Sequence, residues 1–159
     1  MKRFSLGPVI VALVGLAVLL ATAKPAHAQG EPDPEPSSNP LVFKEQLLQF
    51  TMLTRRNLRD IQALPVDDSI PIDPQLLQSL HKAYVLIRAA QFGLSMKVHN
   101  SSNPDPTLVV AKKRAEDAWN LARYPVDYAR QPRGEYIPKS VENLTLALRL
   151  SRQALVILP

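Results

Sequence analysis

The chain has 159 residues, no cysteine, and 19 basic against 14 acidic residues, which give a formal net charge of +5 at pH 7. The absence of cysteine excludes a disulfide framework, c-type haem attachment and a bacterial lipoprotein anchor, because each of these needs a thiol. A net charge this small gives no argument for nucleic-acid binding.

The first 28 residues have the composition of an export signal. Lys2 and Arg3 give a positive start, an apolar run covers residues 9–23, and an Ala-His-Ala sequence ends the segment at Ala28. This is the pattern that a signal peptidase cleaves, so we expect export and cleavage after Ala28. The periplasm, the thylakoid lumen and the extracellular space all fit this signal. The alternative is a retained anchor, but a spanning helix needs roughly 20 apolar residues, more than this run provides.

Cleavage at this position removes 28 of the 159 residues and leaves 131, enough for one domain. It also removes three basic residues, so the net charge falls from +5 to +2. The next segment, residues 29–40, combines prolines with acids and serines and contains no large apolar side chain. This composition predicts a disordered, acidic, proline-rich tether.

Four amphipathic helices are predicted after the tether, over residues 41–64, 74–99, 106–124 and 139–158. In each of them apolar residues recur at spacings of three and four. The second and third begin with an Asp-Pro pair, which supplies an N-cap and a proline in the first turn. Residues 41–159 are therefore expected to form an all-α domain, an antiparallel up-down-up-down four-helix bundle.

A tandem helical repeat is the alternative architecture. Ala147, Ala154 and Leu155 are spaced as in the second helix of a tetratricopeptide repeat, which this short segment resembles. Ser151 stands where that repeat has an aromatic residue, and the preceding segment lacks the Trp-Leu-Gly-Tyr pattern of its first helix. The bundle therefore accounts for more of the chain.

Candidate catalytic and metal-binding groups are sparse. His81 and His99 are the two histidines after the cleavage site, and on one helix they lie about 27 Å apart, too far to share a metal ion. Glu116 and Asp117 are adjacent, so they point in different directions and pair with lysines one turn away. The sequence contains no Gly-x-Ser-x-Gly motif, phosphate-binding loop or Glu-x-x-His pair. We therefore expect no enzyme, no cofactor and no metal.

Two groups of residues are candidates for an interaction surface. The predicted loop 124–137 holds three of the four tyrosines and two arginines, and both residue types are enriched at interface hot spots. The exposed side of the first predicted helix is basic. The candidates are Tyr124, Tyr128, Arg130, Arg133 and Tyr136 in the loop, and Arg55, Arg56 and Arg59 on the helix. The basic residues are not interleaved with aromatics, which argues against single-stranded nucleic acid.

These observations favour an exported, non-enzymatic interaction or structural domain that docks on a larger assembly or at the membrane surface. The expected partner is a protein, a membrane complex or an anionic membrane surface. The alternative is a carrier that binds a small apolar ligand between helices, with Gln91 as its polar group and Trp119 nearby. The alanine stripe of the third helix argues against a carrier, because it closes the space between helices.

Overall fold

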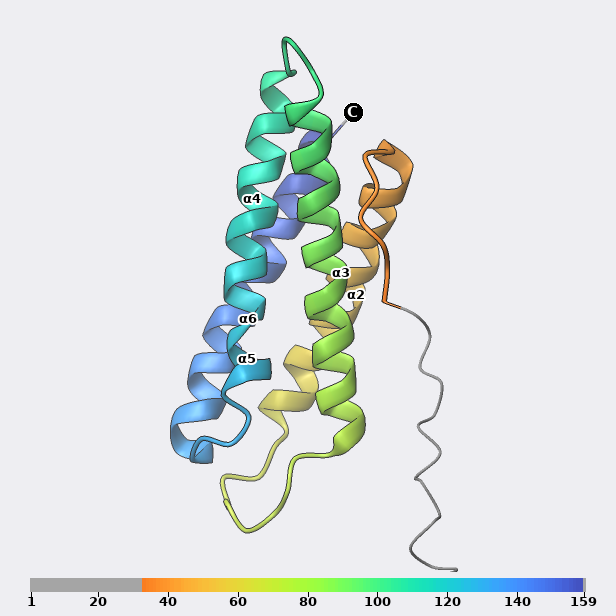
Figure 1. Cartoon of the computed structure of the whole chain (residues 1–159). Helices are drawn as coiled ribbons and strands as arrows, with labels where there is room; N and C mark the ends of the chain where they lie inside the picture. Colours follow the sequence, from red (N-terminus) through yellow and green to blue (C-terminus); the bar gives the residue numbers. More distant parts are fainter. Residues whose placement is uncertain (1–32, 159) are drawn as a thin grey trace, which may run out of the picture. The chain divides into compact units, whose positions relative to one another are not determined.

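The computed structural model describes residues 33–158, so the predicted signal peptide and its cleavage site lie outside the described residues. The elements are α2 (Pro40–Gln62), α3 (Pro74–His99), α4 (Pro106–Ala122), α5 (Tyr124–Asp127) and α6 (Arg133–Ile157). No strand occurs between residues 33 and 158. The prediction of an all-α fold is therefore confirmed (Figure 1).

Three of the long helices begin in the same way. The side chains of Asn39, Asp73 and Asp105 each accept a hydrogen bond from the backbone N–H two residues on, at 3.0, 2.9 and 2.8 Å. A proline follows each cap as the first helical residue. The proline has no N–H to leave unpaired, and its fixed φ suits a helix. Helices α3 and α4 therefore begin at the two Asp-Pro pairs.

The last long helix begins earlier than predicted. We expected a start at residue 139, just after Pro138, but α6 starts at Arg133 and contains Pro138. A proline inside a helix removes one backbone hydrogen bond. Tertiary contacts offset this loss, because Asp68 Oδ1 accepts a hydrogen bond from the Arg133 backbone N–H at 2.6 Å and the Tyr136 side chain is fully buried. The predicted loop 124–137 is thus divided between α5, a short linker and the start of α6.

Two other helices end slightly before their predicted ends. Helix α2 stops at Gln62 rather than residue 64, and α4 stops at Ala122 rather than residue 124. Pro65 follows the end of α2, and a proline disfavours helical geometry in the residue before it, so α2 stops short of Leu64. Helix α4 ends at a break of one residue, Arg123, because Tyr124 and Pro125 already belong to the short helix α5.

Each long helix packs against two others. Helix α2 contacts α3 and α6, and α4 likewise contacts α3 and α6. Figure 1 shows α4 and α6 lying side by side, with α2 on the far side of α3. Small side chains permit the close packing of α4, whose buried residues are Ala111, Ala115, Ala118 and Ala122.

The core consists of two clusters. The larger one sets phenylalanines and leucines of α2 and α3 against the alanines of α4 and α6. The smaller cluster contains Ile61, Ile72, Leu76, Leu80, Tyr136 and Leu144. The smaller cluster therefore depends on the start of α6, which supplies Tyr136.

Residues 33–39 precede α2 and lie against the helices (Figure 1). Gln46 Nε2 donates a hydrogen bond to the Glu35 carbonyl oxygen at 2.9 Å. A Cβ atom on Gly93 of α3 would overlap the Ser37 carbonyl oxygen, so the two backbones approach closely. Residues 33–39 therefore have backbone contacts with α2 and α3, and the disordered tether over residues 29–40 stays a prediction. The amino-acid composition describes only the side chains of this segment, whereas its backbone contacts Gln46 of α2 and Gly93 of α3.

Candidate docking surface

The exposed side of α2 carries a stripe of apolar and basic side chains that one acid, the exposed Glu45, interrupts between Leu41 and Leu48. Leu41, Leu48, Met52, Arg55 and Arg59 are separated by seven, four, three and four residues, which places them on one face of the helix. All five are exposed, Leu41 by 75% and Met52 by 66%. Single exposed apolar residues are ordinary, but a contiguous group of them marks an interaction surface.

A second stripe runs along α6. Thr145, Arg149, Arg152 and Val156 are separated by four, three and four residues, and all are exposed, Val156 by 84%. The stripes flank one seam, because Thr51 Oγ1 of α2 lies 3.2 Å from the Ser151 Oγ of α6. Thr51 directly precedes Met52 of the first stripe, and Ser151 directly precedes Arg152 of the second. We call the two stripes together the α2–α6 face.

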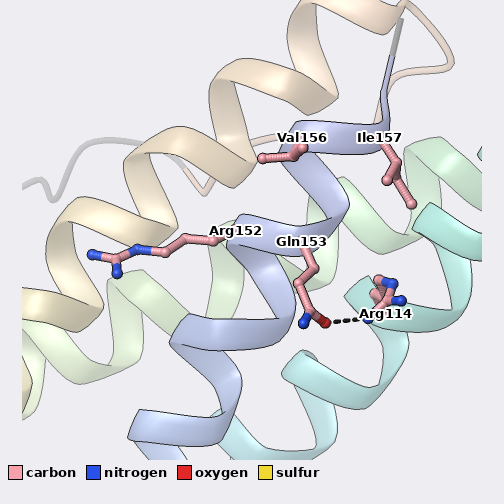
Figure 2. A pocket seen from close by; sticks show the side chains of 5 residues that line it. All are labelled: Arg114, Arg152, Gln153, Val156 and Ile157. Atoms are coloured by element: carbon pink, nitrogen blue, oxygen red, sulfur yellow. Dashed lines mark hydrogen bonds between the residues drawn. The ribbon is translucent and has the colours of Figure 1, made fainter.

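Figure 2 shows one end of this face. Arg152 and Gln153 extend in different directions from α6, and with Val156 and Ile157 they line a groove. Gln153 Oε1 accepts a hydrogen bond from Arg114 of α4, so Arg114 is held within the domain. Arg152 makes no such bond to a described residue and is left for solvent or a partner.

The α2–α6 face is cationic. Arg55, Arg59, Arg149 and Arg152 have no ion-pair partner between residues 33 and 158. The face contains one acid, the exposed Glu45 of α2, which accepts a hydrogen bond from Gln49 Nε2 at 3.1 Å. Arg56 differs, because its Nε lies 3.7 Å from the Asp60 carboxylate one turn away. Of the three predicted arginines of α2, two are therefore available and one is paired.

Two of the predicted contacts in segment 124–137 are buried instead. The Tyr136 hydroxyl donates to the Pro125 carbonyl oxygen at 2.9 Å, and burial raises the pKa of Tyr136. Arg133 is only 6% exposed, and its Nη2 donates to the Ile70 carbonyl oxygen at 3.2 Å. The guanidinium carbon lies 5.9 Å from the centre of the Tyr136 ring. Because α6 starts at Arg133, its helical register turns both side chains inward, where a partner cannot reach them.

The other three residues of this segment differ from one another in exposure. The Tyr124 hydroxyl donates to Gln131 Oε1 at 2.8 Å, and its ring stacks on Tyr128 with centroids 4.6 Å apart. Tyr128 and Arg130 are exposed. Of the five candidates the segment therefore offers a partner two exposed side chains and the half-buried Tyr124.

Sequence reasoning missed the apolar part of the α2–α6 face. The spacing of three and four that predicted this helix is that of Phe43, Leu47 and Phe50, and these three are fully buried. The signal for the exposed side was a second apolar series, Leu48 and Met52, offset from the first by one or two positions. Helix α2 therefore has apolar side chains on its exposed side as well as on its buried side.

The side chains considered for catalysis and metal binding form no metal-binding cluster in the described part of the chain, and the two acids pair with a lysine. Between residues 33 and 158, no three His, Asp or Glu side chains gather closely enough to hold a metal ion. Lys113 Nζ lies 2.9 Å from Asp117 and 3.8 Å from Glu116. The hydrogen bond to Asp117 and the charges of both acids raise the pKa of Lys113.

The residues considered for a ligand carrier lie within the packed helices. Gln91 Nε2 donates to Ser95 Oγ at 3.0 Å, one turn along the same helix. The Trp119 ring has the rings of Tyr84 and Phe92 as neighbours, each at 6.5 Å between centroids. Gln91 Oε1 and Trp119 Nε1 are buried and have no hydrogen-bond partner in the described part of the chain. The carrier stays a prediction.

Comparison of the chain with protein-family models, with curated proteins and with solved structures finds no match. In the described part of the chain, no helix combines the length and the apolar character needed to cross a membrane. Arguments about function therefore rest on the surface chemistry of residues 33–158.

Proposed function

We propose that the chain is an exported, non-enzymatic docking domain that binds an anionic surface, on a larger assembly or on a membrane, through the α2–α6 face. One observation carries this proposal. Four arginines without ion-pair partners in the described part stand beside four exposed apolar side chains, namely Leu41, Leu48, Met52 and Val156. Export rests on the sequence pattern of residues 1–28.

The chemistry of the face determines what it can bind. Burying apolar side chains contributes about 25 cal/mol per Å² of area removed from water. Arginine donates paired hydrogen bonds to carboxylate or phosphate oxygens, and several like charges accelerate encounter with an anionic partner. A surface that is anionic and has apolar area beside its charges can bind both the arginines and the apolar side chains of the face.

We also propose that the four long helices form an antiparallel up-down-up-down bundle. Contacts between α2 and α6, the first and last of them, support this arrangement. A linear stack of helical repeats confines contacts to neighbouring units. In a closed bundle the two stripes are held side by side as one surface.

The test uses the chain cleaved after Ala28 and two anionic targets. One target is vesicles of phosphatidylglycerol and phosphatidylcholine, and the other is native membranes solubilised in mild detergent, from which the tagged chain captures partners. We expect the Arg55→Ala/Arg59→Ala double variant to lose most binding to whichever target the wild type binds. The matched control is the Arg56→Ala/Asp60→Ala variant, which removes a whole ion pair, leaves the net charge unchanged and should bind like the wild type. The proposal fails if neither target binds, or if the Arg55→Ala/Arg59→Ala variant binds as well as this control.

A further inference from the structure

Residues 33–37 lie along the outer side of α3, separate from the α2–α6 face. Asp33, Pro34 and Pro36 on one side, and the α3 residues on the other, line a cleft of about 260 Å³. The α3 residues are Val85, Arg88, Ala89 and Phe92. The cleft is lined by residues of α3, whereas the stripes of the α2–α6 face lie on α2 and α6.

Two residues of the helices recognise the backbone of this segment. Gln46 is almost fully buried, and its Nε2 donates to the Glu35 carbonyl oxygen at 2.9 Å. Gly93 lies inside α3, where glycine is unfavourable, and the space of its missing side chain holds the Ser37 carbonyl oxygen. A site for an extended main chain needs a donor for its carbonyl oxygens and space for its backbone, and here Gln46 gives the donor and Gly93 gives the space.

The side chains on α3 suit the composition of the segment. Phe92 is partly exposed, and the Arg88 guanidinium lies 5.7 Å from the centre of its ring. Proline-rich segments bind to aromatic-lined grooves, because their extended form loses little entropy on binding. Residues 33–36 read Asp-Pro-Glu-Pro, so acids alternate with prolines beside an arginine and a phenylalanine.

We propose that α3, with Gln46 of α2, forms a binding groove for an extended, acidic, proline-containing peptide, and that residues 33–37 of the same chain occupy it. We call this site the arm groove. Its residues are Gln46, Val85, Arg88, Ala89, Phe92 and Gly93. A peptide of the same composition supplied in trans competes with the arm for the groove. The arm has the advantage of its covalent connection at Pro40, since a short tether gives an effective concentration in the millimolar range.

The first experiment uses two glycine substitutions in the chain cleaved after Ala28. Gly93→Ala places a Cβ atom against the Ser37 carbonyl oxygen, whereas a Cβ on Gly134 of α6 has no neighbour within 4 Å. Backbone ¹⁵N relaxation measures the mobility of the arm amides. In the wild type and in Gly134→Ala we expect order parameters for residues 35 and 37–39 near the helical value of about 0.85, and in Gly93→Ala values below about 0.6. Equal order parameters in the two variants overturn the proposal.

The second experiment frees the groove without touching α3, because Gly93→Ala also crowds the Phe43 Cβ at 3.3 Å. The Pro34→Gly/Pro36→Gly variant removes both cleft-lining prolines and should release the arm. A synthetic peptide with the sequence of residues 31–39 is then added at about 1 mM, near the effective concentration of the tethered arm. We expect saturable shifts of the Val85, Arg88 and Phe92 amides, and none with a peptide whose prolines are replaced by glycine. Absence of shifts, or equal shifts with both peptides, overturns the proposal.

Discussion

Two regions predicted for docking, helix α2 and segment 124–137, place the same side-chain type in opposite environments. Arg55 and Arg59 are exposed and have no ion-pair partner in the described part of the chain. Arg133 is buried and donates to the carbonyl oxygens of Ile70 and Ala129. Enrichment of arginine and tyrosine at interfaces therefore does not identify a docking surface by itself. Helix register decides whether such residues face a partner or the core.

The register of α6 explains the difference. Arg133, Tyr136 and Ser140 are separated by three and four residues, and this series continues the buried side of the helix. On α2 the arginines continue the exposed apolar series of Leu48 and Met52. Variants that remove a buried or an exposed side chain of these regions test this difference, and the expected effects differ widely in size.

The largest expected effect comes from Tyr136→Ala. This change empties the space of a fully buried aromatic ring and should lower the free energy of unfolding by about 3–5 kcal/mol. Urea unfolding followed by circular dichroism measures the difference. Tyr128→Ala is the control, because its ring is exposed and loses only the stacking on Tyr124, worth about 0.5–1.5 kcal/mol. Similar losses in the two variants would contradict the assignment of Tyr136 to the core.

The next effect is that of Arg133→Met. Methionine fills part of the volume but leaves the carbonyl oxygens of Ile70 and Ala129 without their donor. We expect the free energy of unfolding to fall by about 1–3 kcal/mol. Arg130→Met, at an exposed position, should change it by less than about 0.5 kcal/mol. Equal stabilities of the two variants in urea unfolding would show that the contacts of Arg133 do not hold the start of α6.

The same contrast shows how much of the fold the sequence could predict. The starts of α3 and α4 follow from Asp-Pro pairs, because a cap acts on backbone groups two residues away. The start of α6 cannot be predicted in this way, because the local sequence favours a helix that starts after Pro138. Asp68, which caps Arg133, lies 65 residues earlier in the chain.

The candidate surfaces follow the same division. The basic residues of α2 were visible in the sequence, but the α2–α6 face also needs the stripe of α6, and that pairing depends on which helices are neighbours. The contact between Gly93 and Ser37 likewise joins distant parts of the chain. Neither of these pairings can be predicted from the composition of single segments.

A smaller effect concerns the Tyr136 hydroxyl. Tyr136→Phe removes its hydrogen bond to the Pro125 carbonyl oxygen, which should cost about 1 kcal/mol at neutral pH. Burial raises the pKa of Tyr136 above its usual value of 10.0. The unfolded chain therefore loses this proton at lower pH than the folded chain, and stability falls as the pH rises above 10. Urea midpoints measured between pH 8 and pH 11 should decline less steeply for the Phe variant. Parallel declines would mean that the ring titrates as an exposed tyrosine does.

The smallest expected effect is that of Asp60→Asn, and it tests whether the α2–α6 face or the net charge governs docking. Asp60 neutralises Arg56 in an exposed ion pair, so its loss should change the free energy of unfolding by less than about 1 kcal/mol. It frees one arginine next to the face, which should tighten binding to phosphatidylglycerol vesicles by about fivefold, or roughly 1 kcal/mol per charge. Glu135→Gln removes an acid from the first turn of α6 and changes the net charge equally. If both variants tighten binding alike, the whole-molecule charge attracts the membrane, and the position of the arginines on α2 gives no specificity. A gain confined to Asp60→Asn locates the attraction on the α2–α6 face.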